Sequence, residues 1–356
     1  MDYKTYLKTE IQRLLFIETG RDITLNIKGN PVLKKGEYPV FPDSIIGLAV
    51  KEEDGIPVNS IVDAMIHLIA CDPSFKYNDD YKGFLKTIPG IESFIIMNIE
   101  RDKKEKTKRA VIYATTLTAL NPNREYRMNR IYLLMELYEK TGLKCVEDEI
   151  LKSLRDLAED YPSYGTPNYY LGQYYLEKDM DSAKLYLRKA LNDPITYNEA
   201  SKLLERIKRT EEYDSAVELV KSGRGMEALK ILIPYIEDNP QGLDAIYYAA
   251  VAYRQIGNYE KALLYLNELL QYGERPEVYS EIGINLAALG DFSQAIEHFR
   301  RALKITPDDS GIICNIAVCH LNLGEIEEAK RAFSLATRIN PKDEIAKEWL
   351  EKLKEV

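Results

Sequence analysis

Cysteine and histidine side chains, which could ligate a metal or act as nucleophiles, are few in this chain of 356 residues. Three of them, Cys314, Cys319 and His320, lie close together on one expected helix. Cysteines at positions i and i+5 do not share a helix face, and no second cluster completes the four ligands of a zinc site. We therefore interpret these side chains as small core residues, and we expect no metal and no other cofactor.

No recognisable catalytic set appears in the sequence. It has no phosphate-binding glycine loop, no dinucleotide-binding glycine pattern and no His-Glu-x-x-His motif. His67 lies within an apolar segment and is interpreted as a core or helix-surface residue, whereas His298 is interpreted as solvated. The carboxylates Asp54, Asp63 and Glu100 leave an enzyme with an unrecognised N-terminal active site as the least favoured hypothesis. We expect a protein without catalytic residues.

The charge balance argues against nucleic acid and membrane partners. The chain has 48 basic and 57 acidic residues and a net charge of −9. Sequence-independent binding to nucleic acid or to an anionic membrane needs a basic face. The one basic run, Arg101–Arg109, contains Asp102 and Glu105 and is interpreted as a solvated linker.

Features linked to cellular location point to the cytoplasm. The four scattered cysteines do not form a disulfide framework. The first residues lack the basic start and apolar run of a signal peptide. No apolar run approaches the ~20 residues that span a membrane. We therefore expect a cytoplasmic protein.

A period of about 34 residues in the second half indicates stacked helical hairpins. Glycines recur at intervals of 34, 33 and 34 residues, at Gly223, Gly257, Gly290 and Gly324. An alanine follows each glycine five residues later, at Ala228, Ala262, Ala295 and Ala329. Prolines follow three of the four units, at Pro240, Pro307 and Pro341. Glycine tolerates positive φ at a helix end, alanine lets two helices approach closely, and proline ends the second helix.

This pattern resembles the tetratricopeptide repeat, a helix–turn–helix unit. The resemblance is closest in Pro276–Asp309 and Ser310–Asp343; it is clear over residues 209–343 and weaker over 107–208. It implies an all-α fold, a right-handed solenoid of helical hairpins. The expected parts are a mainly helical N-terminal region at 1–105, degenerate hairpins at 106–208, four repeats at 209–341 and a capping helix at 342–356.

The N-terminal region does not show the repeat clearly. An amphipathic pattern predicts a helix over Asp2–Thr19, and the alternation at Asp22–Lys28 is compatible with a short strand. Glycines and prolines make residues 29–42 loop-like. Further helices are expected at Val58–Ala70, Asp79–Lys86 and Ile91–Arg101, and an extra helix at Ile195–Lys208.

The resemblance also implies a binding surface, because in this family the first helix of each hairpin lines a concave groove. Carried over to this sequence, the contact places are Tyr169, Gln173, Tyr213, Val217, Tyr247, Val251, Arg254, Ser280, Ile284, Cys314 and Val318. These residues predict an apolar, tyrosine-rich groove with little fixed charge. The Lys, Asn and Arg with which some family members hold a terminal carboxylate are largely absent. A second interpretation is that the tyrosines pack against neighbouring hairpins or a docked N-terminal region.

The leading hypothesis is a non-enzymatic scaffold or adaptor that binds a protein or peptide segment in this groove. The implied partner is an apolar or amphipathic segment, and self-association is a further option. The alternative hypothesis is a regulator whose repeats sense a peptide and whose N-terminal region delivers the output.

Overall fold

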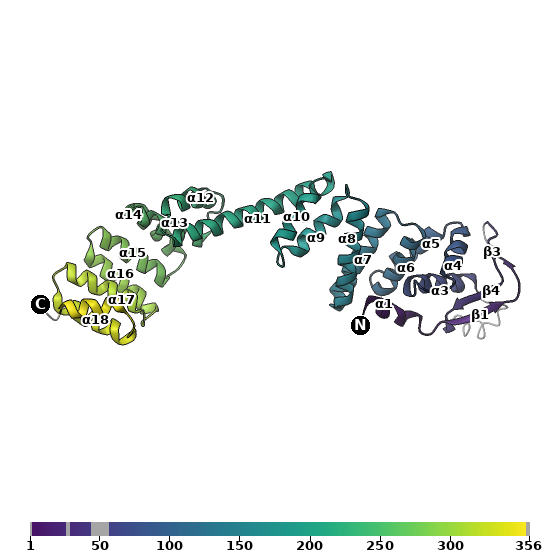
Figure 1. Ribbon diagram of the computed structural model, residues 1–356, viewed down its shortest axis with the longest axis horizontal. Coiled ribbons are helices and arrows are strands. Elements are labelled where there is room, and N and C mark those ends of the chain that lie inside the picture. Colours follow the sequence, from purple (N-terminus) through teal and green to yellow (C-terminus); the bar gives the residue numbers. More distant parts are fainter. Residues whose placement is uncertain (1, 26–28, 44–56, 354–356) are drawn as a thin grey trace. The chain divides into compact units, whose positions relative to one another are not determined.

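The computed structural model describes residues 2–25, 29–43 and 57–353, and most of them are helical (Figure 1). The chain forms two compact units that divide between Leu204 and Glu205. The N-terminal unit combines short strands with helices, whereas in the part of the C-terminal unit that the structure describes the regular elements are all helices. The expected helical solenoid is thus confirmed, with strands added at its N-terminal end.

The N-terminal unit begins with a short helix and two small antiparallel sheets. Helix α1 (Tyr3–Lys8) is capped by the Asp2 side chain and continues into the 3-10 helix η1 (Thr9–Ile11). Strand β1 (Leu15–Thr19) pairs with β4 (Gly36–Val40), and β2 (Ile23–Thr24) pairs with β3 (Val32–Leu33). The predicted helix over residues 2–19 is therefore correct only in its first half, which holds α1 and η1, and the predicted loop over 29–42 is wrong because it contains β3 and β4. The aromatic and β-branched run of β1 finds its partner about twenty residues away, which local periodicity does not show.

The remaining elements that the structure describes before residue 194 are helices. They are α3 (Val58–Cys71), α4 (Asn78–Thr87), α5 (Ile91–Asp102), α6 (Thr107–Leu120), α7 (Arg124–Thr141), α8 (Lys144–Asp160), α9 (Gly165–Tyr175) and α10 (Met180–Ala190). The core of α3 to α6 includes Met65, Leu85 and Ile95, all fully buried. In the hairpin of α9 and α10, a Cβ added to Gly172 would lie 2.6 Å from Leu187 Cγ, so the glycine permits the close approach of the two helices.

Helix α11 (Pro194–Lys221) is continuous across the boundary between the units. The sequence predicts a separate helix at 195–208 followed by the first helix of a repeat. These two segments form one helix of 28 residues because no glycine or proline interrupts them.

The C-terminal unit is a series of helical hairpins. After α11 come α12 (Gly225–Asp238), α13 (Leu243–Gln255), α14 (Tyr259–Leu269), the 3-10 helix η2 (Leu270–Tyr272), α15 (Pro276–Ala288), α16 (Phe292–Ile305), α17 (Ser310–Asn322), α18 (Ile326–Ile339) and α19 (Glu344–Leu353). The four repeating glycines all have positive φ, between 76° and 86°. The four repeating alanines are fully buried. The periodic residues thus have the structural roles that the sequence predicts.

Two aromatic rings fill the spaces between the hairpin helices. Phe299 lies beside Gly283, where an added Cβ would be 2.6 Å from the ring atom Cε1. Phe333 is fully buried and stacks on Trp349 of α19 with ring centroids 6.0 Å apart. Helix α19 thus covers the last hairpin with one apolar face. Among the described helices, none is both long and apolar enough to cross a membrane.

Candidate functional site

The predicted groove residues of the C-terminal unit lie on its successive first helices. Tyr213 and Val217 lie on α11, the next three on α13, and the remainder on α15 and α17. Their spacing of three, four or seven residues places them on one face of each helix. Those that are partly exposed are Tyr213, Val217, Tyr247, Arg254, Ser280, Ile284 and Val318. Val251 and Cys314 are buried, so these two side chains are not accessible to a partner.

Tyr213 and Tyr247 are half-buried and each contacts another tyrosine. Tyr213 stacks on Tyr235 with centroids 5.0 Å apart, and Tyr247 meets the edge of Tyr248 at 5.6 Å. Burial, with nearby carboxylates as smaller causes, raises the pKa of Tyr213 and of Tyr247 to about 12. Both phenols are therefore neutral at physiological pH. Each side chain packs partly against a neighbouring tyrosine and keeps part of its surface exposed.

Arg254 is paired with a carboxylate that the sequence analysis did not single out. Its Nε lies 2.7 Å from Glu281 Oε2 and its Nη2 lies 3.4 Å from Glu281 Oε1. The exposed fractions of the two side chains are 28% and 12%. This half-buried pair joins α13 to α15 and neutralises the arginine. A comparison of the charged residues on successive first helices would have revealed this pair.

The cluster of Cys314, Cys319 and His320 is divided among separate partners. Cys314 Sγ lies 3.5 Å from Asp343 Oδ2, and burial raises the pKa of this thiol to about 12. Burial raises the pKa of Cys319 to about 11. His320 Nδ1 lies 2.5 Å from Glu325 Oε2. Within the described residues, no group of three potential ligands is placed to hold a metal ion.

Two predicted contact residues lie in the N-terminal unit, on α9. Tyr169 is partly exposed and Gln173 is exposed, and the Gln173 side-chain amide donates a hydrogen bond to Tyr169 Oη at 3.1 Å. The Tyr169 ring also meets the edge of Tyr170 at 5.8 Å, which in turn meets Tyr132 at the same distance. A small aromatic surface thus extends from α7 to α9.

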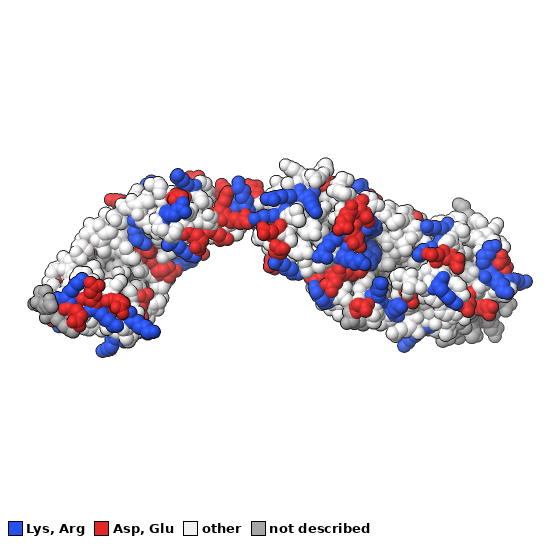
Figure 2. Space-filling view, viewed as in Figure 1, with Lys and Arg blue, Asp and Glu red and all other residues white. Residues whose placement is uncertain are grey.

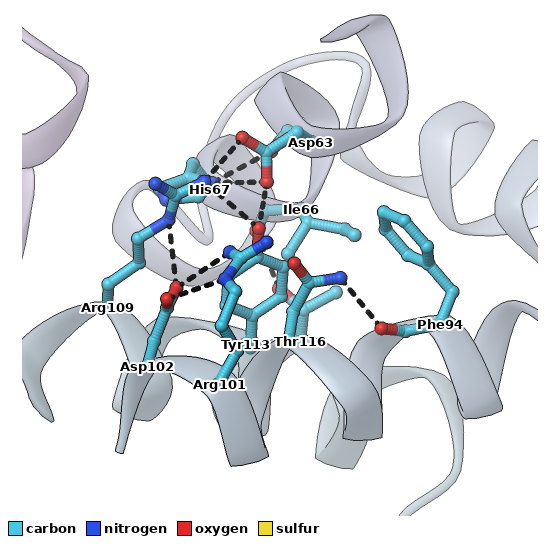
Figure 3. Close-up of polar contacts among 10 residues, drawn as sticks. Asp63, Ile66, His67, Phe94, Arg101, Asp102, Arg109, Tyr113 and Thr116 are labelled. Atoms are coloured by element: carbon cyan, nitrogen blue, oxygen red, sulfur yellow. Dashed lines mark hydrogen bonds and ion pairs between the residues drawn. The ribbon is translucent and has the colours of Figure 1, made fainter. Parts of the chain in front are cut away.

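The N-terminal unit also contains a polar cluster that joins α3 to α5 and α6 (Figure 3). Asp63 on α3 receives hydrogen bonds from Arg109 Nη2, at 2.9 Å, and from the Tyr113 hydroxyl, both on α6. Asp102 is 3% exposed and receives two hydrogen bonds from Arg101, at 2.8 and 3.0 Å. Arg109 Nε lies 3.3 Å from the same carboxylate. Each carboxylate is therefore held by a cation.

His67 lies at the centre of the contacts between α3 and α6. It is 3% exposed, its Nδ1 donates to the Asp63 backbone carbonyl at 2.8 Å, and its ring packs edge-on against Phe41 and Tyr113. Burial lowers the pKa of His67, so its imidazole is neutral. The interpretation of His67 as a core residue is confirmed. Its contacts hold α3 against α6, and its ring is not accessible to a substrate.

Three other sequence interpretations can be compared with the structure. The run Arg101–Arg109 is not a solvated linker, because it contains the end of α5 and the start of α6 and includes the buried Asp102. His298 is half-buried beside Tyr279, and burial lowers its pKa, so it is not a solvated side chain. Glu100 pairs with Lys103 at the surface, and Asp54 lies outside the described residues.

Two cavities in the N-terminal unit were not predicted. One, of about 660 Å³, has an aromatic lining of Tyr38, Tyr77, Tyr81 and Phe84, with lysines and carboxylates at its rim. The other, of about 350 Å³, lies against Arg130, whose nitrogens donate to Thr115, Ser153 and Glu149 at 2.7 to 3.0 Å. The first depends on strands that local pattern did not reveal, and the second on side chains from several helices.

The fold and the spacing of its hairpins define a helical-repeat protein. Two family models, both described as "Tetratricopeptide repeat", match residues 213–277 and 286–353 respectively. These segments therefore belong to the tetratricopeptide repeat family.

Curated relatives carry the same repeat in their names. The TPR repeat-containing protein MJ1428 of Methanocaldococcus jannaschii is 24% identical over 255 residues, which cover 65% of this chain and 43% of the relative. The TPR repeat-containing protein MJ1345 of the same organism is 44% identical over 50 residues, which cover 14% of this chain and 16% of the relative. The chain thus spans less than half the length of either relative.

Parts of this chain are also similar to solved structures. MamA (residues 41 to the end) from Desulfovibrio magneticus RS-1 has a TM-score of 0.37 and 14% identity, covering 51% of this chain and 97% of that one. The second TPR domain of human RPAP3, in complex with an HSP70 peptide, has a TM-score of 0.30 and 16% identity, covering 32% of this chain and 98% of that one.

Proposed function

We propose that the C-terminal unit binds a segment of another protein along the exposed faces of α11, α13, α15 and α17, and that the protein is a non-enzymatic scaffold or adaptor. The observation that carries this proposal is the row of half-exposed tyrosine and aliphatic side chains on successive first helices. A surface of this kind suits a partner that is itself apolar or amphipathic.

The side chains of this surface support burial of apolar area as the main source of affinity for a partner protein. Tyr213 and Tyr247 are neutral, and Arg254 is already paired with Glu281. Burial of apolar surface contributes about 25 cal/mol per Å² before the costs of association are subtracted. On the face in view, Lys and Arg are interspersed with Asp and Glu (Figure 2). We therefore favour a protein partner over nucleic acid or membrane, and with four free cysteines a cytoplasmic setting.

The proposal includes degenerate repeats of the same kind over residues 106–208. Gly172 lies against Leu187 in the hairpin of α9 and α10, as Gly283 lies against Phe299 in the hairpin of α15 and α16. In both hairpins an added Cβ would lie 2.6 Å from the facing side chain. This shared packing supports the extension of the hairpin array into residues 106–208.

The test is a double substitution, Tyr213→Ala with Tyr247→Ala, in the full-length chain. Partner proteins captured from the native cell extract are quantified by mass spectrometry, and folding is followed by circular dichroism. We expect capture of the specific partners to fall several-fold while the helical signal is retained. The control is Tyr265→Ala on α14, which removes a comparable half-buried ring from the contact with Tyr253. Unchanged capture with a lower thermal midpoint in the double variant would show that these tyrosines only stabilise the hairpins.

A further inference from the structure

We infer that the binding surface of the C-terminal unit selects a positively charged amphipathic segment, one that carries lysine or arginine beside its apolar residues. The inference rests on the proposed function and adds the charge of the partner. It comes from three carboxylates near Tyr213 and Tyr247, namely Asp244, Glu277 and Glu281.

The carboxylates and the tyrosine share one face of two neighbouring helices. On α13, Asp244, Tyr247 and Arg254 follow one another at spacings of three and seven residues. On α15, Glu277 and Glu281 are four residues apart. Residues at these spacings lie on the same side of a helix. The ion pair between Arg254 and Glu281 joins these two helix faces.

A second contact extends this face to the end of α13. Arg275, which precedes α15, lies 3.3 Å from Asp244 Oδ1. The two ion pairs therefore fix both ends of the region between α13 and α15. The Asp244 side chain is 77% exposed, and Glu277 is also exposed. These two carboxylates are accessible to a partner.

The local charge is negative after the internal pairs are counted. The face carries Asp244, Glu277 and Glu281 against the guanidinium groups of Arg254 and Arg275. Among the described residues, Glu277 makes no ion pair within 4.0 Å. Burial raises the pKa of Tyr247, and the neighbouring carboxylates Glu281 and Glu277 raise it further.

This arrangement favours a cationic ligand for two physical reasons. An exposed carboxylate attracts an ammonium or guanidinium group, and the face of a tyrosine ring adds a cation–π contact worth about 0.5–1 kcal/mol at exposed sites. A terminal carboxylate would meet the opposite conditions, because Arg254 is neutralised by Glu281. A second copy of this chain, with its net charge of −9, is also disfavoured as the occupant.

The experiment uses two fluorescein-labelled synthetic peptides of ~18 residues that share one amphipathic leucine pattern. Their polar positions are all lysine in one peptide and all glutamate in the other. Fluorescence anisotropy with the full-length protein is measured at low and high NaCl. We expect the lysine peptide to bind at least about tenfold more tightly than the glutamate peptide, with an affinity that falls as salt screens the charges.

Matched variants locate the interaction on this face. Asp244→Asn with Glu277→Gln should weaken the lysine peptide about two- to tenfold, since each exposed ion pair contributes little. The control, Glu260→Gln with Glu268→Gln on α14, makes the same change in net charge at exposed positions of a second helix. It should leave the affinity unchanged.

The outcomes separate this inference from the proposed function. Equal affinity for both peptides, weakened in each case by the tyrosine double variant, would overturn the charge preference and leave the binding surface intact. An equal loss in the α14 control would attribute the preference to net charge alone and overturn the inference. If the tyrosine double variant binds the lysine peptide with unchanged affinity, both proposals are contradicted.

Discussion

Substitution of Gly283 by alanine should loosen the hairpin of α15 and α16, which supports the binding surface. The added Cβ would lie 2.6 Å from Phe299 Cε1 and 2.8 Å from both Cδ1 and Cζ, well inside normal contact distance. Phe299 is 1% exposed, so its ring is enclosed by neighbouring side chains that must also shift if it moves. Overpacking costs about 1–3 kcal/mol, and an approach under 3.0 Å to three atoms of a buried ring lies in the upper part of that range, at about 2–3 kcal/mol. Alanine regains about 1 kcal/mol of helix propensity, which leaves a net loss of about 1–2 kcal/mol.

Hydrogen exchange measured by mass spectrometry gives this local free energy directly. A net loss of about 1–2 kcal/mol corresponds to roughly five- to thirtyfold faster exchange in peptides from α15 and α16, because 1.4 kcal/mol is a factor of ten. Gly83→Ala in α4 is the control, since nothing lies within 4 Å of an added Cβ there. It should not accelerate exchange. Unchanged or slower exchange in Gly283→Ala would refute the close packing of Gly283 against Phe299.

Other predictions concern single contacts. Phe333→Ala should destabilise the last hairpin by about 3–5 kcal/mol and shift the fluorescence of Trp349, the only tryptophan, to longer wavelength; Phe333→Leu should do less, and equal effects would contradict the stacking. Glu281→Ala should lower the urea midpoint of unfolding by leaving Arg254 half-buried and unpaired. Addition of Arg254→Met to this variant should restore part of the loss, and a further fall of the midpoint would refute the pairing. Burial lowers the pKa of His67 below its ordinary 6.5, so the unfolded chain binds more protons near pH 6 and stability falls with pH below about 6.5. His67→Gln should flatten this slope between pH 7 and 5.5, and an unchanged thermal-midpoint profile would contradict it.

The repeats were predictable from sequence because each structural role needs a particular residue type. Gly257 and Gly290 adopt positive φ, and Ala262 and Ala295 sit where helices touch. Such requirements recur with the period of the hairpin and are visible without a structure. The predicted contact places of the C-terminal unit likewise lie on successive first helices, although Val251 and Cys314 turn out to be buried.

What the sequence did not reveal depends on distant partners. Strand β1 exists because residues 36–40 pair with it, and the helical pattern over residues 2–19 gave no sign of this pairing. Asp63 and Arg109 are 46 residues apart and meet only after α3 packs on α6. The role of Glu281 becomes apparent only when Arg254, on the preceding first helix, lies beside it. Local periodicity identifies helices well, but it does not identify which side chains two helices bring together.

Site-specific photocrosslinking tests the central claim, binding of a protein segment by the face of α13, most directly. Tyr247→p-benzoylphenylalanine places a photoreactive group on this face, and Leu264→p-benzoylphenylalanine places the same group on α14, at a side chain that is 66% exposed. After irradiation of cells that express each variant, we expect protein adducts from position 247 that are absent from position 264. Adducts that are identical at both positions, or that form only at position 264, would contradict the account.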